Sequence, residues 1–225
     1  MTAPPAATLA QLEAAGVESG RPLLISDADE VLFRFVEAFV GHIGERGFTF
    51  DWSSFRLTGN VRRTADDVVL DQTQVSGLLQ RFFAECTEDI PPVPGAADGL
   101  ARLARAGAQI VVLTNVPPAQ RDARRLALAR NRMPYPVVVN TGHKGPAAAW
   151  LAARSKGPAV FVDDGPNNHV SVKQAAPEIA CLHFVATDRL ARLVDMPPEA
   201  DGRPEDWPAL ERAVAASLEL TCGGT

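Results

Sequence analysis

The chain has 225 residues and a formal net charge of -5, with 46% hydrophobic and 22% charged residues. This charge gives no electrostatic reason to expect a nucleic-acid partner, and no apolar run approaches the roughly 20 residues that cross a bilayer. The length suits one α/β core with a smaller insert.

The amino-terminal residues and the cysteines indicate the compartment. Residues 1–20 have no basic start followed by an apolar core, so they do not resemble a secretory signal, and we expect a cytoplasmic protein. The three cysteines, Cys86, Cys181 and Cys222, are widely separated and have no zinc-binding spacing. Free thiols are therefore expected.

The first predicted strand, Leu23 to Ile25, is followed by two carboxylates, Asp27 and Asp29. A short apolar run predicts a buried parallel strand, and open α/β sheets bind ligands at the carboxyl ends of such strands. Because side chains alternate along an extended chain, both carboxylates should address one ligand. Taken alone, such a pair is more often a solvated turn at the end of a strand.

Residues 34–90 have a different pattern. Apolar residues recur there at helical spacing in two segments, and the proline-rich segment 91–95 ends the region. We therefore expect a mostly helical insert. The two sets of apolar positions are Phe35, Val36, Phe39, Val40 and Ile43, and then Val75, Leu78, Leu79, Phe82 and Phe83.

From residue 96 onward, predicted strands and helices alternate. This alternation predicts a Rossmann-like α/β fold, with a parallel sheet and helices on both faces. The core comprises 1–33 and 91–225, of which 1–20 and 196–225 are terminal extensions. The expected strands are 109–113, 137–139, 159–162 and 182–185, and the expected helices are 96–107, 117–130, 146–153 and 209–220.

The unusual polar residues of the core follow these strands. Their positions match four motifs of the haloacid dehalogenase-like (HAD) hydrolase superfamily, which the chain resembles. The residues that carry the resemblance are Asp27-Ala28-Asp29-Glu30-Val31, Val111-Val112-Leu113-Thr114-Asn115, Lys144, and Val160-Phe161-Val162-Asp163-Asp164. The resemblance implies a HAD-like core in which 34–90 form a small, mostly helical C1 cap.

The resemblance also implies roles in phosphoryl transfer. Asp27 would be the nucleophile that forms an aspartyl-phosphate, and Asp29 would be the general acid and base. Thr114 would donate to a phosphoryl oxygen, while Lys144 would offset negative charge. Dehalogenases proper lack the second Asp because a leaving halide needs no proton, so Asp29 favours phosphate-ester chemistry.

A magnesium ion is the expected cofactor, because carboxylates and a phosphate share one pocket. The ligands that the resemblance implies are Asp27, the backbone carbonyl of Asp29, and Asp164. Asp163 would support the metal site without binding the ion directly, although the two adjacent acids could exchange these roles. Asn168 falls where some relatives have a second acid.

The expected substrate is a small phosphorylated metabolite, because a cap that excludes water also excludes a macromolecule. Candidate substrate-binding residues are Asn115, Arg56, Arg62 and Arg63, although a surface cluster of arginines is more commonly just solvated. Glu30 replaces the usual Gly and either touches the substrate or faces solvent. A phosphomutase and a non-catalytic binding or regulatory protein remain alternatives, no membrane partner is expected, and the oligomeric state is not predicted.

Overall fold

The computed structural model describes residues 3–220, and its centre is a five-stranded sheet. The strand order is β5-β4-β1-β6-β7, and every neighbouring pair is parallel. The first strand of the chain is therefore the middle strand of the sheet. The strands are β1 (Leu23–Ser26), β4 (Gln109–Thr114), β5 (Val137–Val139), β6 (Ala159–Asp163) and β7 (Ala180–His183).

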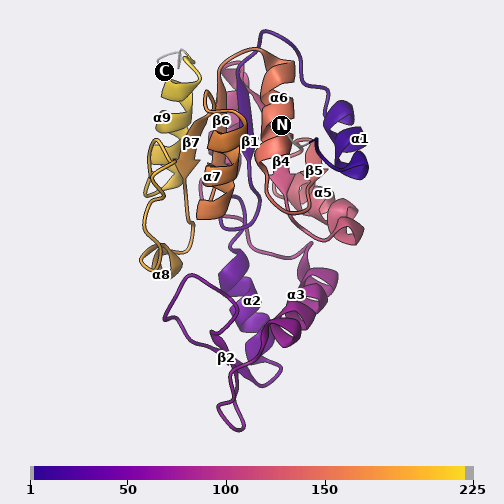
Figure 1. Cartoon of the computed structure of the whole chain (residues 1–225), viewed down its shortest axis with the longest axis vertical. Helices are drawn as coiled ribbons and strands as arrows, with labels where there is room; N and C mark the ends of the chain where they lie inside the picture. Colours follow the sequence, from indigo (N-terminus) through magenta and orange to yellow (C-terminus); the bar gives the residue numbers. More distant parts are fainter. Residues whose placement is uncertain (1–2, 221–225) are drawn as a thin grey trace.

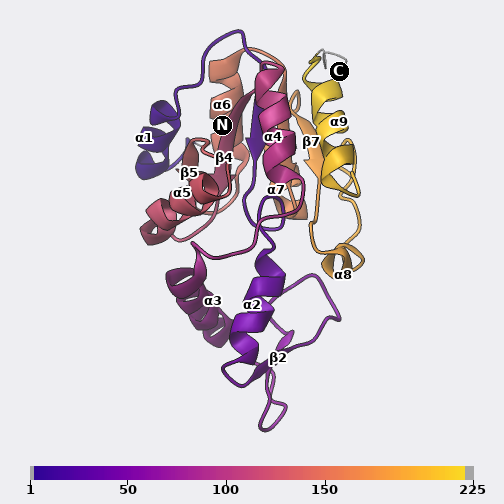
Figure 2. The same ribbon diagram turned by 180° about the vertical axis from the view of Figure 1, so that it is seen from behind.

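Six helices cover the two faces of this sheet. They are α1 (Ala6–Ala14), α4 (Ala96–Arg105), α5 (Arg121–Arg130), α6 (Gly145–Ser155), α7 (Pro166–Ala175) and α9 (Trp207–Ser217). Figure 1 looks onto α6 and α7, and Figure 2, the view from behind, looks onto α4. In β1, Leu24 packs with the layer of α4, α5 and α9, whereas Leu23 and Ile25 pack with the layer of α1, α6 and α7. Burial on both faces explains the apolar run from Leu23 to Ile25 in β1.

The insert between β1 and α4 lies beyond the carboxyl ends of the strands, in the lower part of Figure 1. It contains α2 (Phe35–Gly44), β2 (Phe48–Phe50), β3 (Val61–Arg63) and α3 (Gln72–Cys86). Both helices were expected. The antiparallel pair of β2 and β3 was not, because strands of three residues are too short to show an alternating pattern.

Aromatic side chains form the core of the insert. The ring of Phe82 lies 5.6 Å from the rings of both Phe35 and Phe39, in edge-to-face arrangements. Phe83 stacks on Phe35 at 5.4 Å. These contacts join α2 to α3, and they explain why the apolar positions of the two helices recur at helical spacing.

Other elements also differ from the sequence-based expectation. The helix α1 was not predicted within 1–20, and α7 was not predicted after the strand that ends near residue 163. The helix expected from residue 117 begins as a 3-10 helix, Pro118–Gln120, and becomes α5 only at Arg121. β7 ends at His183 rather than at residue 185, because the chain then turns toward the insert and into the short helix α8 (Asp188–Ala191).

Composition led to expectations about the membrane and the thiols. Within residues 3–220, no helix is both long and apolar enough to cross a bilayer. Cys86 and Cys181 are free thiols. Cys222 lies outside the described residues.

Glu30 ties the insert to the sheet. Its backbone φ is 57°, in the region that glycine prefers, and the residue is only 1% exposed. One carboxylate oxygen accepts a hydrogen bond from the Val36 N–H at 2.8 Å, at the start of α2. The other accepts from the Thr187 N–H at 3.0 Å, after β7. Burial raises the pKa of Glu30. The side chain therefore does not face solvent. It forms a buried link between the start of α2 and the segment after β7, which we call the Glu30 clasp.

Replacing Glu30 with Ala should destabilise the protein by about 2–3 kcal/mol, because two buried N–H groups lose their acceptor. Glu30→Gly should be less destabilised than Glu30→Ala, by about 1 kcal/mol, since glycine removes the strain of the positive φ. Urea unfolding of the three proteins measures both differences. Equal stability of Glu30→Ala and the wild type would contradict the clasp.

Candidate active site

Three carboxylates meet at the carboxyl edge of the sheet. Asp27 directly follows β1, Asp163 is the last residue of the neighbouring strand β6, and Asp164 comes next. One carboxylate oxygen of each residue lies within 4.8 Å of those of the other two. Since β1 and β6 are parallel neighbours, the topology itself brings these acids together.

Lys144 lies between two of the three carboxylates. Its Nζ is 2.7 Å from Asp27 Oδ2 and 2.7 Å from Asp163 Oδ2, and its side chain is 1% exposed. Burial by itself lowers the pKa of Lys144, but the charges of Asp163 and Asp27 raise it above its ordinary value. Lys144 therefore stays protonated and links Asp27 of the first motif to Asp163 of the fourth.

The adjacent acids Asp163 and Asp164 are held differently. Asp163 Oδ1 accepts hydrogen bonds from the Gly165 N–H at 2.8 Å and from Asn168 Nδ2 at 2.9 Å, while Oδ2 bonds Lys144. In the described part of the chain, no donor bonds the carboxylate of Asp164; only its backbone oxygen has a partner, His183. Asp164 is thus the acid that is free to bind a cation, and Asp163 is fixed by protein groups.

The charge of the cluster favours a divalent cation. Burial raises the pKa of Asp27 to about 7, against the opposing effect of Lys144. Burial, together with the charges of Asp163 and Asp27, also raises the pKa of Asp164 well above its ordinary value. One ammonium group does not offset three carboxylates at this range, and hard oxygen ligands suit Mg²⁺. The residues therefore fit the expected metal.

Two buried histidines contact the backbone of the two adjacent acids. His169 Nε2 lies 3.0 Å from the backbone oxygen of Asp163, and His183 Nε2 lies 2.9 Å from that of Asp164. Burial lowers the pKa of both rings, that of His183 to about 4, so the rings are neutral near pH 7. Sequence reasoning gave these scattered histidines no role, because their convergence depends on the packing of α7 against β7.

Asp29 is held by a residue that sequence reasoning missed. Its Oδ1 accepts a hydrogen bond from Arg124 Nη2 at 2.6 Å, and the Arg124 side chain, in α5, is fully buried. A signal was present in the sequence. Arg124 precedes the buried residues Ala127 and Leu128 by three and four positions, so it shares their face of the helix.

Thr114 and Asn115 end β4 beside the cluster. Thr114 is fully buried, and its Oγ1 accepts from the Val116 N–H at 3.2 Å, so the hydroxyl hydrogen remains available to donate. Asn115 is exposed, but its amide donates to the Gly142 carbonyl at 2.8 Å and accepts from Asn140 Nδ2 at 3.0 Å. Asn115 therefore braces the loop that leads to Lys144, and its contact with a substrate stays a prediction.

Two of the three candidate substrate-binding arginines of the insert lie near acids. Arg63 Nη1 is 2.9 Å from Asp66 Oδ2, and Arg62 Nη1 is 3.4 Å from Asp67 Oδ2, because the turn after β3 brings these acids back. Arg56 is exposed. These pairs lie on the surface and contribute little to stability. A role of the three arginines in substrate binding stays a prediction.

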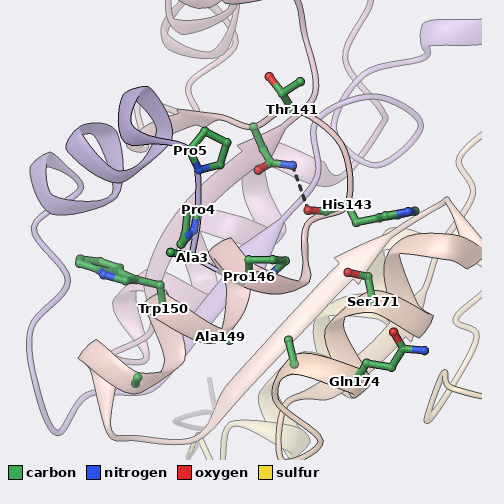
Figure 3. Close-up of a pocket in the computed structure, with 13 residues that line it drawn as sticks. Ala3, Pro4, Pro5, Thr141, His143, Pro146, Ala149, Trp150, Ser171 and Gln174 are labelled. Atoms are coloured by element: carbon green, nitrogen blue, oxygen red, sulfur yellow. Dashed lines mark hydrogen bonds between the residues drawn. The ribbon is translucent and has the colours of Figure 1, made fainter. Parts of the chain in front are cut away.

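A cavity of about 820 Å³ is separate from the acid cluster. It is lined by the segment before α1, the loop before Lys144, and parts of α6 and α7 (Figure 3). Trp150 and His143 contribute to its walls, and none of its lining residues is an acid. The chemistry of the candidate site therefore lies with the carboxylates at the sheet edge, not in this cavity.

No family model matches the chain, and no curated protein matches it. Solved structures do. A HAD family hydrolase from Deinococcus radiodurans R1 with bound phosphate and sodium has a TM-score of 0.59 at 17% identity, covering 92% of this chain and 99% of that one. CbbY from Rhodobacter sphaeroides, in complex with phosphate, has a TM-score of 0.53 at 20% identity, covering 89% and 100%. A putative β-phosphoglucomutase from Bacteroides vulgatus has a TM-score of 0.51 at 16% identity, covering 95% and 97%.

These similarities extend over nearly the whole of each protein. At such identities the likeness concerns the fold. The chain therefore has the fold of the haloacid dehalogenase-like hydrolases, the superfamily that its motifs resemble.

Proposed function

We propose that this protein is a magnesium-dependent phosphatase of small phosphate monoesters, acting through an aspartyl-phosphate on Asp27. The observation that carries the proposal is the buried contact of Lys144 with both Asp27 and Asp163. Asp27 lies two residues before Asp29 in the first motif. The phosphate bound in two of the similar structures supports it.

The reaction has two steps. In the first, a carboxylate oxygen of Asp27 forms a bond to phosphorus while the ester bond breaks, and Asp29 gives its proton to the leaving oxygen. In the second, water attacks phosphorus, Asp29 takes a proton from that water, and the bond between Asp27 and phosphorus breaks. Phosphate leaves, and both carboxyl groups return to their starting states.

Charge at the site would be balanced by the groups already described. Lys144 holds the nucleophile in place, and the Thr114 hydroxyl would donate to a phosphoryl oxygen. Asp27, Asp164 and the backbone carbonyl of Asp29 would hold Mg²⁺, with Asp163 behind them. The ion would offset the negative charge of the carboxylates and the phosphate.

The insert favours a small substrate, because it lies over the carboxyl edge where these residues meet (Figure 1). A phosphomutase would use the same residues, and one similar structure is a putative β-phosphoglucomutase. In that case the phosphoryl group would pass to a sugar hydroxyl instead of water. Dehalogenation is disfavoured, because Asp29 serves a leaving group that needs a proton.

Asp27→Asn should reduce phosphate release to background, because the amide is not a nucleophile for phosphorus. The measurement is phosphate release from a panel of small monoesters, with Mg²⁺ or with chelator. Circular dichroism provides the control for folding. Normal turnover by Asp27→Asn would remove the nucleophile assignment. Phosphoryl transfer from wild type to an added sugar phosphate, without phosphate release, would favour the mutase.

Asp29→Asn should slow turnover of an alkyl phosphate by about 10²–10⁴-fold, the usual contribution of a general acid and base. With p-nitrophenyl phosphate, whose leaving group needs no proton, Asp29→Asn should instead give a burst of one p-nitrophenol per enzyme and then stall as the phospho-enzyme. Stopped-flow absorbance measures the burst. A full steady-state rate with both esters would contradict the role of Asp29.

Metal-free stability should fall as the pH rises toward 7. The ordinary pKa of Asp27 is 3.8 and its folded pKa is about 7, so between these values the folded chain holds a proton that the unfolded chain has lost. Mg²⁺ binds the ionised carboxylates and should therefore raise the Tm more at about pH 8 than at about pH 5.5. Thermal melts with Mg²⁺ or chelator measure this effect.

Asp164→Asn is the matched control for the metal experiment. Removing one of three crowded carboxylates should raise the metal-free Tm at the higher pH and abolish the response to Mg²⁺. The same Mg²⁺ response at both pH values, or in Asp164→Asn, would count against the proposed metal site.

A further inference from the structure

Arg124 occupies a position of α5 where the pattern calls for an apolar residue. Together with Ala127 and Leu128, it forms the buried face of the helix, and none of its surface is exposed. Its guanidinium carbon lies 4.8 Å from the ring centroid of Phe33, over the ring face. A leucine or methionine here would also present an apolar surface to Phe33.

A charge at this position is costly. Within residues 3–220, Arg124 Nε and Nη1 are buried and meet no acceptor, so the cation–π contact with Phe33 and the hydrogen bond from Nη2 to Asp29 Oδ1 are its compensation. A buried charge with unsatisfied donors lowers stability relative to an apolar side chain of similar volume. The stability of the core therefore does not explain why an arginine stands at position 124. The contact of Arg124 with Asp29 offers another explanation.

What Arg124 holds is one oxygen of Asp29. The backbone around Asp29 is fixed already, because the Phe33 N–H donates to the Ala28 carbonyl at 2.9 Å and the Glu30 N–H donates to the Phe33 carbonyl at 2.8 Å. These bonds do not fix the side-chain torsions of Asp29, which the 2.6 Å contact with Arg124 does. The Asp29 side chain is 19% exposed while that of Arg124 is 0% exposed, so of the two only Asp29 is accessible to a ligand.

We propose that Arg124 is a positioning residue for proton transfer: it holds Asp29 by Oδ1, so that Oδ2 delivers the proton to the leaving oxygen and later receives one from water. This inference rests on the proposed function. Arg124 keeps its own protons throughout; the proton passes from Asp29 to the leaving oxygen as the ester bond breaks, and from water to Asp29 as the second bond to phosphorus forms. Pre-organising a proton donor in this way lowers the barrier of the step that uses it.

The test compares two esters in the first chemical step. In Arg124→Met, which removes the charge but keeps an unbranched apolar side chain, single-turnover formation of the phospho-enzyme from an alkyl phosphate should slow by about 10–100-fold. Formation from p-nitrophenyl phosphate should change by less than about 3-fold, since no proton is needed. KM should stay unchanged for both. A purely structural role would slow both esters equally, and that result would overturn the proposal.

Two further variants sharpen this comparison. Arg125→Met is the matched control, because Arg125 is the next residue of α5 but is exposed and pairs with Asp122; it should change neither rate. In an Asp29→Asn background, Arg124→Met should cause no additional loss with the alkyl phosphate, since the two residues act in one step. Additive losses would contradict action through Asp29. Arg124→Lys, which keeps a cation, should recover part of the rate and also serves if Arg124→Met does not fold.

The crystal structure of Arg124→Met, or of Arg124→Lys if needed, gives a readout that does not depend on turnover. The Asp29 carboxylate should leave its wild-type rotamer, while the contacts of Lys144 with Asp27 and Asp163 persist. An unchanged Asp29 rotamer would overturn the positioning role. If the wild-type protein hydrolyses no ester, the proposed function fails, and the structure of the variant still decides whether Arg124 positions Asp29.

Discussion

The crowding of three carboxylates, two of them buried, around one buried ammonium group is the constraint on which the site depends. Lys144 contacts Asp27 and Asp163, which follow the two neighbouring strands at the centre of the sheet. The surrounding residues hold this cluster in place through hydrogen bonds. Asn168 and the Gly165 N–H satisfy the remaining oxygen of Asp163, and two neutral histidines fix the backbone that carries the acids. Within residues 3–220, the carboxylate of Asp164 has no protein donor, so it is the member of the cluster that would bind a cation under the proposed function.

The parts of the fold that the sequence predicts are those that depend on local pattern. The strands β1, β4, β5 and β6 are short apolar runs, and parallel topology places their polar ends at one edge, so the order of motifs was enough to bring Asp27, Lys144 and Asp163 together. The helices α2 and α3 show clear helical spacing. The pair β2 and β3 does not, since three residues are too few to show a period of two.

The parts that escaped prediction depend on non-local contacts. Arg124 binds Asp29 across 95 positions of sequence, and Glu30 accepts from Thr187 across 157. Neither partner can be read from the neighbouring sequence. Residue type was even misleading: a glutamate in place of glycine suggested a surface or substrate role, whereas the carboxylate is enclosed and bonded to two backbone N–H groups. A buried charge has to be recognised from the face of the helix or turn on which it lies.

The Glu30 clasp also limits how the insert can move. The two chain segments that connect the insert to the sheet lie side by side, with an antiparallel bridge between Phe33 and Pro92 and a bond from the Arg34 N–H to the Pro91 carbonyl. Together with the clasp, they form a braced two-strand stalk. Swinging at the stalk requires several buried hydrogen bonds to break at once, so it is a slow and rare event compared with flexing of the outer loops of the insert. If a small molecule reaches the carboxylates only when the insert moves about these two segments, the rate of that movement, rather than diffusion, would limit the rate of access.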